Sequence, residues 1–108
     1  MKSNVVVHTR VRDFVKALPP EPRKKLRNAI RGLAHHKGDI KPLQGALAGT
    51  YRLRAGAYGV IFSTQMQEGK RVVICHYAQH RSIVYEVLEA KETLKKLLVK
   101  KEDEEFNH

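Results

Sequence analysis

The sequence predicts an α+β fold with a mainly antiparallel sheet, in the order strand, helix, helix, three meandering strands and helix. Three observations support this class: a β-branched run near the start, helical spacing of apolar residues on both sides of a central region, and strand-like alternation with turn signals inside that region. Helices are expected to cover one face of the sheet and to leave the other face open and basic. The length of 108 residues predicts a single domain over residues 1–100. An acidic tail, residues 101–108, is expected to be disordered.

The first half of the chain predicts one strand and two helices. Residues 5–8 form a short β-branched run that is typical of a buried strand. Apolar residues then recur at helical spacing, which predicts a helix over residues 9–18 with Thr9 as its cap. A Pro-Pro pair ends that helix, and a second helix is expected over residues 21–38. Residues 39–49 are irregular and are expected to form a loop.

The second half predicts three strands and a terminal helix, over residues 51–54, 57–64, 70–77 and 82–100. In the first of these strands apolar and basic residues alternate, so Arg52 and Arg54 are expected on the open face and their apolar neighbours on the core face. A two-residue turn at Ala55-Gly56 would pair Arg52 with Gly59 across the hairpin. A Gln-Glu-Gly turn is expected between the second and third of these strands.

The charge balance favours a polyanionic partner. The chain has 21 Lys and Arg against 11 Asp and Glu, a net charge of +10. Residues 101–108 carry one basic and four acidic side chains, so residues 1–100 carry +13. Such a field suits nucleic acid, an acidic protein or an anionic membrane surface. The alternative is a solvated basic face with no specific partner.

The sequence disfavours several other classes of protein. No apolar run approaches 18 residues, and the apolar stretch at the start is too short for a signal peptide, so we expect a cytoplasmic protein without a membrane segment. Cys75 is the single cysteine, which excludes a disulfide framework, and the histidines lack ligand spacing. We therefore expect no metal and no cofactor. Cys75 is expected to be a strand residue and not a nucleophile.

Two groups of residues have the chemistry of a phosphate-handling site. Arg52 and Arg54 are two residues apart on one strand, which puts their side chains on one side about 6–7 Å apart, a spacing that suits adjacent backbone phosphates. Further along, His80 can carry a proton near neutral pH, Arg81 can offset the charge of a phosphorane, and Tyr85 can stack on a base or sit near a reacting hydroxyl. The alternative is that these are ordinary polar residues of a strand and neighbours on a helix.

In its order of elements and in four short motifs, the chain resembles the RelE/ParE superfamily, the toxins of type II toxin–antitoxin pairs, and its RelE-like members in particular. The resemblance runs from Val5 to Leu98, nearly the whole domain. The motifs are Leu43-Gln44-Gly45, Gly49-Thr50-Tyr51-Arg52-Leu53-Arg54-Ala55-Gly56, Tyr58-Gly59-Val60-Ile61-Phe62, and His80-Arg81 with Val84-Tyr85. Each motif is weak alone, and the specificity of the resemblance comes from their joint order and spacing.

The resemblance implies an activity and its partners. RelE-like members are small endoribonucleases that need no metal and cut mRNA in the ribosomal A site, through attack of a 2′-hydroxyl on the adjacent phosphate and release of a 5′-hydroxyl end. By position in the motifs, the implied catalytic residues are Arg52, Arg54, His80 as proton donor, Arg81 and Tyr85. The implied partners are mRNA on the ribosome and a cognate acidic antitoxin. The apolar anchors of the antitoxin would enter a groove formed by the first two helices and the sheet.

One position departs from the family pattern. Where members usually have an arginine that holds the phosphate, this chain has Gly59. Loss of such a contact typically lowers the rate by about 10²–10³. Three explanations stay open: a weakened natural toxin, a substitute such as Arg71, or a mutation selected during cloning because the active toxin kills its host. An arginine restored at position 59 is expected to rescue cleavage.

Two other functions fit the same predicted fold. A ParE-like toxin would poison DNA gyrase without nuclease chemistry, and the presence of His80, Arg81 and Tyr85 argues against it. A catalytically inactive basic module, neutralised by an antitoxin, would need none of these residues, and Gly59 is the argument in its favour. An endoribonuclease is the first expectation from the sequence.

Overall fold

A five-stranded sheet is the frame on which the helices pack. The computed structural model describes residues 3–89, and its strands run in the order β1-β5-β4-β3-β2. β1 pairs with β5 in parallel and the other pairs are antiparallel, which confirms the predicted α+β class. The elements are β1 (Asn4–Val7), α1 (Thr9–Lys16), α2 (Pro20–Gly32), the 3₁₀ turn η1 (Leu33–His35), β2 (Asp39–Pro42), the 3₁₀ turn η2 (Gly45–Leu47), β3 (Thr50–Ala55), β4 (Tyr58–Gln67), β5 (Lys70–His80) and α3 (Arg81–Glu89).

The helix ends differ from the prediction in small ways. His8 and not Thr9 caps α1, because the imidazole Nδ1 of His8 accepts a hydrogen bond from the backbone N–H of Arg10 at 3.1 Å. α2 ends at Gly32, where η1 takes over, so this helix is shorter than predicted. α3 begins one residue earlier than predicted. Residues 90–108, which hold the rest of the predicted terminal helix and the predicted tail, lie outside the described residues.

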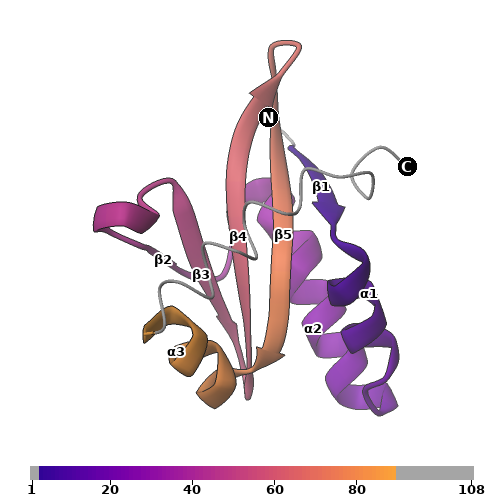
Figure 1. Cartoon of the computed structure of the whole chain (residues 1–108). Helices are drawn as coiled ribbons and strands as arrows, with labels where there is room; N and C mark the ends of the chain where they lie inside the picture. The colour runs from indigo at the N-terminus through magenta and orange to yellow at the C-terminus, as the bar shows by residue number, and fades with distance from the viewer. Residues whose placement is uncertain (1–2, 90–108) are drawn as a thin grey trace.

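The first two helices cover one face of the sheet. Val11 of α1 and Leu26 of α2 are buried there, and Phe62 of β4 is fully buried between them and the other strands. Apolar residues recur on one side of each helix, so that side packs on the sheet while lysines and arginines point to solvent. Figure 1 shows α1 and α2 together on one side of the sheet.

α3 lies on the opposite face, so the prediction that helices cover only one face is wrong. Val84 of α3 is fully buried against Ile61 of β4, and Leu47 of η2 completes a second core. Figure 1 shows α3 well apart from α1 and α2. The second face of the sheet is therefore partly covered. Lys41 of β2 and Arg52 and Arg54 of β3 lie on this face, beside α3.

Strand β2 forms where the sequence predicted a loop. Its four residues pair antiparallel with β3 at the edge of the sheet, and Ile40 packs against the first core. Asp39 and Lys41 flank Ile40 and lie on the other face, as the alternation of a strand requires. The strand ends at Pro42, which cannot donate to the sheet and is tolerated at an edge.

The β3–β4 hairpin differs in register from the prediction by two residues. Arg54 faces Gly59, and Arg52 faces Ile61. The turn lies one residue later than predicted, with Gly56 in it at a φ of 62°. A shift of two residues leaves each side chain on its predicted face. The two arginines therefore still share the face that carries α3.

Candidate functional site

Arg52 and Tyr85 come together at the edge of α3. The guanidinium carbon of Arg52 lies 5.5 Å from the centre of the Tyr85 ring, a cation–π contact between β3 and α3. The Nε of Arg52 is buried and has no hydrogen-bond partner within residues 3–89. A buried donor without a partner is unfavourable. A phosphate oxygen is the kind of acceptor that would satisfy it.

Lys41 lies directly across from Arg52 on the neighbouring strand β2. Paired residues of an antiparallel ladder share a face and have Cα atoms about 4.5–5.5 Å apart, so the exposed Lys41 and the guanidinium of Arg52 border one surface. We call Lys41, Arg52 and Tyr85 the Arg52 site. Sequence reasoning missed Lys41 because it fell in the predicted loop. The alternation of polar Asp39, apolar Ile40 and polar Lys41 is the signal that could have found it.

Arg54 lies on the same face and already has a partner. Its Nε is 3.3 Å from Oδ2 of Asp39, directly across the β2–β3 pair. The side chains are 46% and 55% exposed, so solvent screens the pair and its contribution to stability is about 0–1 kcal/mol. The charge of Arg54 is offset in the free chain, and this distinguishes it from Arg52.

Gly59 is buried beneath α3. A Cβ built at this position would lie 3.2–3.4 Å from the side-chain atoms of Val84, closer than most real contacts. A side chain at position 59 would therefore push against the helix. The structure gives Gly59 a packing role that none of the three sequence explanations included.

Arg71 does not take the place of the missing arginine. It pairs with Met66 near the start of β5, eight residues from Gln79, the β5 partner of Gly59. Eight residues of strand span about 26 Å. The Nη2 of Arg71 instead lies 3.1 Å from Nδ1 of His36. The explanation that Arg71 supplies the positive charge missing at position 59 is therefore wrong.

His80 lies at the end of β5 with its ring on the other face. It pairs with Tyr58, and the two ring centroids are 6.2 Å apart. The Nδ1 of His80 is 2.9 Å from the hydroxyl of Ser82. The structure brings Arg52 and Tyr85 together, and it does not bring the His80 ring to either of them.

Arg81 is the first residue of α3 and is exposed. Its backbone N–H donates a hydrogen bond to the carbonyl of Ala57 at 2.8 Å, which ties the start of the helix to the β3–β4 turn. Arg81 and Tyr85 are four residues apart and are neighbours on one side of the helix. Arg81 therefore lies one helical turn from the Arg52 site.

Other reactive side chains offer no second centre. Cys75 is fully buried in β5, as expected for a strand residue, and burial raises the pKa of its thiol from 9.0 to about 12. Within the part of the chain that the structure describes, no three His, Cys, Asp or Glu side chains are grouped so that they could hold a metal ion. Among the same residues, no helix has the length and apolar character needed to span a membrane.

Comparison with solved structures finds toxins of one superfamily. The toxin–antitoxin complex RelBE2 of Mycobacterium tuberculosis has a TM-score of 0.60 at 26% identity, over 76% of this chain and 94% of that chain. The RelB–RelE antitoxin–toxin complex of Methanococcus jannaschii has a TM-score of 0.51 at 24% identity, over 75% and 95%. The chain has the RelE/ParE toxin fold. This confirms the resemblance drawn from the motifs.

A third RelE/ParE-type structure shares the fold at lower identity. The YoeB/ParE toxin of Agrobacterium tumefaciens has a TM-score of 0.58 at 14% identity, over 71% of this chain and 97% of that chain. No protein-family model and no curated protein matches the sequence. In this RelE/ParE fold, the Arg52 site and Gly59 lie on the α3 face of the sheet, and α1 and α2 lie on the other.

Proposed function

We propose that this chain is the toxin of a toxin–antitoxin pair and a RelE-like endoribonuclease that cleaves mRNA on the ribosome. The RelE/ParE fold supports the first part, since two of the solved neighbours are toxins in complex with antitoxins. The unpartnered Nε of Arg52 supports the second part, because it is a buried cationic donor beside a second cation and an aromatic ring. The proposed partners are mRNA on the ribosome and an acidic antitoxin.

The proposed reaction uses no metal ion and no cofactor. The ribose 2′-hydroxyl loses its proton and its oxygen bonds to phosphorus, while the bond from phosphorus to the 5′-oxygen breaks. The 5′-oxygen takes up a proton and leaves as a 5′-hydroxyl, and the phosphate remains as a 2′,3′-cyclic diester. The phosphorane carries more negative charge than the starting diester. Cations fixed at the site therefore stabilise the transition state more than the ground state.

Each side chain has a distinct role in this scheme. Arg52 and Lys41 hold the scissile phosphate, and Arg81 adds positive charge from the start of α3. Tyr85 lies near the reacting hydroxyl, with its ring held against Arg52. His80, the proton donor expected from the resemblance, has its ring beside Tyr58 on the other face of the sheet, away from Arg52. In this scheme water therefore supplies the proton to the 5′-oxygen.

The proposed enzyme is attenuated. Arg54 is paired with Asp39 in the free chain, and Gly59 supplies no charge at the position where RelE-like members have an arginine. Loss of one preorganised contact to the transition state lowers rates by about 10²–10³. We therefore propose slower cleavage than in a site with the full set of cations.

Primer extension on translating ribosomes tests the proposal. Arg52→Ala is expected to lower the cleavage rate by about 10²–10³-fold, and Tyr85→Phe is expected to lower it by a smaller factor. Lys24→Ala is the matched control, because Lys24 is exposed on α2, away from the Arg52 site, and should leave the rate unchanged. Absence of cleavage by the unaltered chain, or full activity of Arg52→Ala, would contradict the proposal.

An inactive basic module is the second candidate. The observations in its favour are that Val84 occupies the space above Gly59 and that Asp39 offsets Arg54. Salt-sensitive binding of RNA by the unaltered chain, with no cut in the primer-extension assay, would assign this function. Cleaved DNA in a gyrase assay would instead assign a ParE-like activity.

A further inference from the structure

The ion pair of Asp39 and Arg54 lies beside the Arg52 site on the same two strands. Lys41 faces Arg52, and two residues further along the ladder Asp39 faces Arg54. Residues i and i+2 of a strand share a face and lie about 6.6–6.8 Å apart. Strand β3 supplies an arginine to each pair, whereas β2 supplies a lysine to one and an aspartate to the other. The carboxylate of Asp39 therefore offsets a cation that directly neighbours the proposed phosphate position.

This ion pair is open to exchange with other anions. Its Nε–Oδ2 distance of 3.3 Å is longer than the distance of about 2.7–2.9 Å in a charge-assisted hydrogen bond. The side chains are 46% and 55% exposed, so water and solutes reach both groups. Exposed pairs of this kind shift an equilibrium by no more than about fivefold. A stronger anionic ligand can therefore displace the carboxylate.

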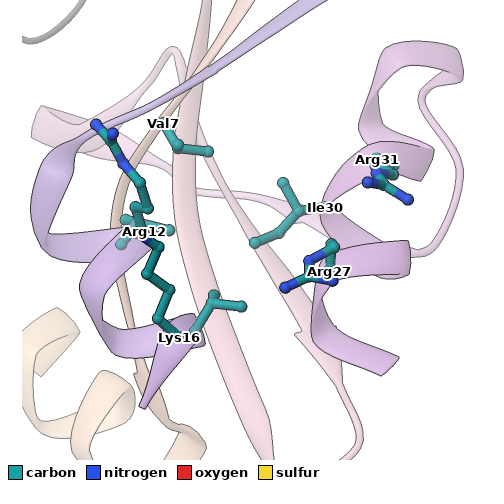
Figure 2. Close-up of a pocket in the computed structure, with 8 residues that line it drawn as sticks. Val7, Arg12, Lys16, Arg27, Ile30 and Arg31 are labelled. Atoms are coloured by element: carbon teal, nitrogen blue, oxygen red, sulfur yellow. The ribbon is translucent and has the colours of Figure 1, made fainter. Parts of the chain in front are cut away.

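Pairing with a carboxylate is unusual among the cations of this chain. Residues 3–89 carry 15 Lys and Arg and six Asp and Glu. The ion pair found within these residues is the one between Arg54 and Asp39. By contrast, four cations around a pocket between α1 and α2 have no carboxylate partner within the same residues: Arg12, Lys16, Arg27 and Arg31 (Figure 2). Asp39 thus neutralises a cation of the α3 face while these other surface cations keep their charge.

We propose that Asp39 competes with RNA for Arg54, and that the phosphate next to the scissile one displaces the carboxylate when RNA binds. The proposal rests on the nuclease function proposed above, which places the scissile phosphate at Arg52. A phosphodiester offers two oxygens to the guanidinium, and a bidentate contact is stronger than the Nε contact of the free chain. No covalent bond changes in this exchange, so Asp39 regulates the affinity for RNA and is not a catalytic residue.

The position of the pair favours RNA over an acidic protein as the displacing ligand. The two cross-strand pairs are adjacent on one face, so one ligand can contact Arg52 and Arg54 together. Consecutive phosphates of an RNA strand meet this condition when the backbone lies along β3. Arg81 adds a cation at the Arg54 end of the face, because its backbone N–H is bonded to Ala57 in the turn that follows β3.

Binding of an uncleavable RNA by the full-length chain tests the competition. The probe is a fluorescent single strand of about 12 nucleotides whose 2′-hydroxyls are all methylated, so that the proposed reaction cannot occur. Its affinity is measured by anisotropy. Asp39→Asn is expected to raise the affinity about three- to fivefold, the upper part of what an exposed ion pair contributes. Asp39→Glu keeps the charge and is expected to stay within twofold of the unaltered chain.

Two further variants separate this competition from a general effect of charge. Asp13→Asn makes the same change in net charge at an exposed position of α1, across the sheet, and is expected to change the affinity by less than twofold. Arg54→Gln removes the contested cation, and in that background Asp39→Asn is expected to give no gain. An equal gain from Asp39→Asn with and without Arg54 would overturn the proposal.

The NMR signal of the Arg54 Nε–H group reports the exchange directly. We expect this signal to shift when Asp39 is replaced by Asn, and to shift again when the RNA probe is added to the unaltered chain. A purely structural role of Asp39 predicts the opposite change in affinity, because a loosened strand β2 would bind RNA more weakly. An Arg54 signal that RNA leaves unmoved would place the phosphate elsewhere and refute the competition.

The remaining outcomes of the binding assay also decide the matter. An unchanged or weaker affinity in Asp39→Asn, or no binding of the RNA probe at all, would overturn the proposal. A gain seen for a short polyglutamate peptide and not for RNA would also overturn it, because the site would then be one for an acidic protein. The binding and NMR readouts do not depend on cleavage, so failure of the nuclease proposal is seen separately.

Discussion

Replacing Gly59 by alanine is expected to strain the contact between β4 and α3 and to destabilise the fold. The new Cβ would lie 3.2 Å from Cγ2 and 3.4 Å from Cγ1 of Val84. Overpacking a core by one methyl group destabilises a protein by about 1–3 kcal/mol. Replacing glycine by alanine also lowers the conformational entropy of the unfolded chain, which stabilises the fold by about 0.4–1 kcal/mol. The expected net loss is about 1 kcal/mol. For a domain of this size it lowers Tm by about 4–8 °C.

A double-mutant cycle with Val84→Ala isolates this contact. Val84→Ala alone removes two buried methyl groups and should cost about 1.6 kcal/mol from transfer alone. In that background Gly59→Ala no longer meets the Cγ atoms and fills part of the cavity, so its effect should become neutral or stabilising. Urea denaturation of the four proteins measures the coupling, expected to exceed about 1 kcal/mol. Equal effects of Gly59→Ala in both backgrounds would refute the packing role of Gly59.

The contact between Gly59 and Val84 leads to an expectation for Gly59→Arg that is opposite to the one drawn from the sequence. Position 59 faces Arg54 and not Arg52, and it lies under Val84. An arginine there must displace α3, and Tyr85 would move away from Arg52 with the helix. We therefore expect Gly59→Arg to lower Tm more than Gly59→Ala and not to restore mRNA cleavage. Full rescue of cleavage with an unchanged Tm would refute this reasoning.

Two further predictions follow from Lys41 and Cys75. Lys41→Ala is expected to lower ribosome-dependent cleavage at least tenfold with little change in Tm, because Lys41 is exposed and borders Arg52. An effect no larger than that of Lys24→Ala would show that Lys41 does not belong to the site. Burial raises the pKa of the Cys75 thiol from 9.0 to about 12, so above pH 9 the unfolded chain loses a proton that the folded chain retains. From pH 8 to pH 10, the free energy of unfolding measured by urea denaturation should therefore fall by about 1.4 kcal/mol more in the unaltered chain than in Cys75→Ala. Equal falls in the two proteins would contradict this prediction.

Local pattern and turn chemistry were sufficient to predict the central strands. The turn between β4 and β5 forms where expected, with Glu68 at a φ of 52° and Gly69 at 78°, the positive values that a tight hairpin needs. The predicted register of β3 against β4 differs from the observed one by two residues, yet Arg52 and Arg54 lie on one face, as predicted. Side-chain direction repeats every two residues, so this error moved no side chain across the sheet.

The residues of α3 alone do not predict on which face of the sheet the helix packs. Their spacing predicts only that one side of the helix is apolar. The decisive signal lay in β4, where Val60, Ile61 and Phe62 form a continuous apolar run that is typical of a strand buried on both faces. Ile61 and Gly59 together make the surface on which Val84 packs. Strand β2 escaped prediction because the alternation of Asp39, Ile40 and Lys41 is short and ends at Pro42, which makes it a weak signal for a strand.

The contact of α3 with the sheet also decides where the positive charge of the site comes from. Val84 occupies the space above Gly59 on β4, so a cation on that side of β3 would compete with the helix for room. The opposite neighbour of β3 is the edge strand β2, where Lys41 faces Arg52. A phosphate held by these two cations would therefore approach from the β2 edge of the sheet, beside α3 and not beneath it. The charge on the edge strand also disfavours pairing with another sheet, which keeps this edge accessible.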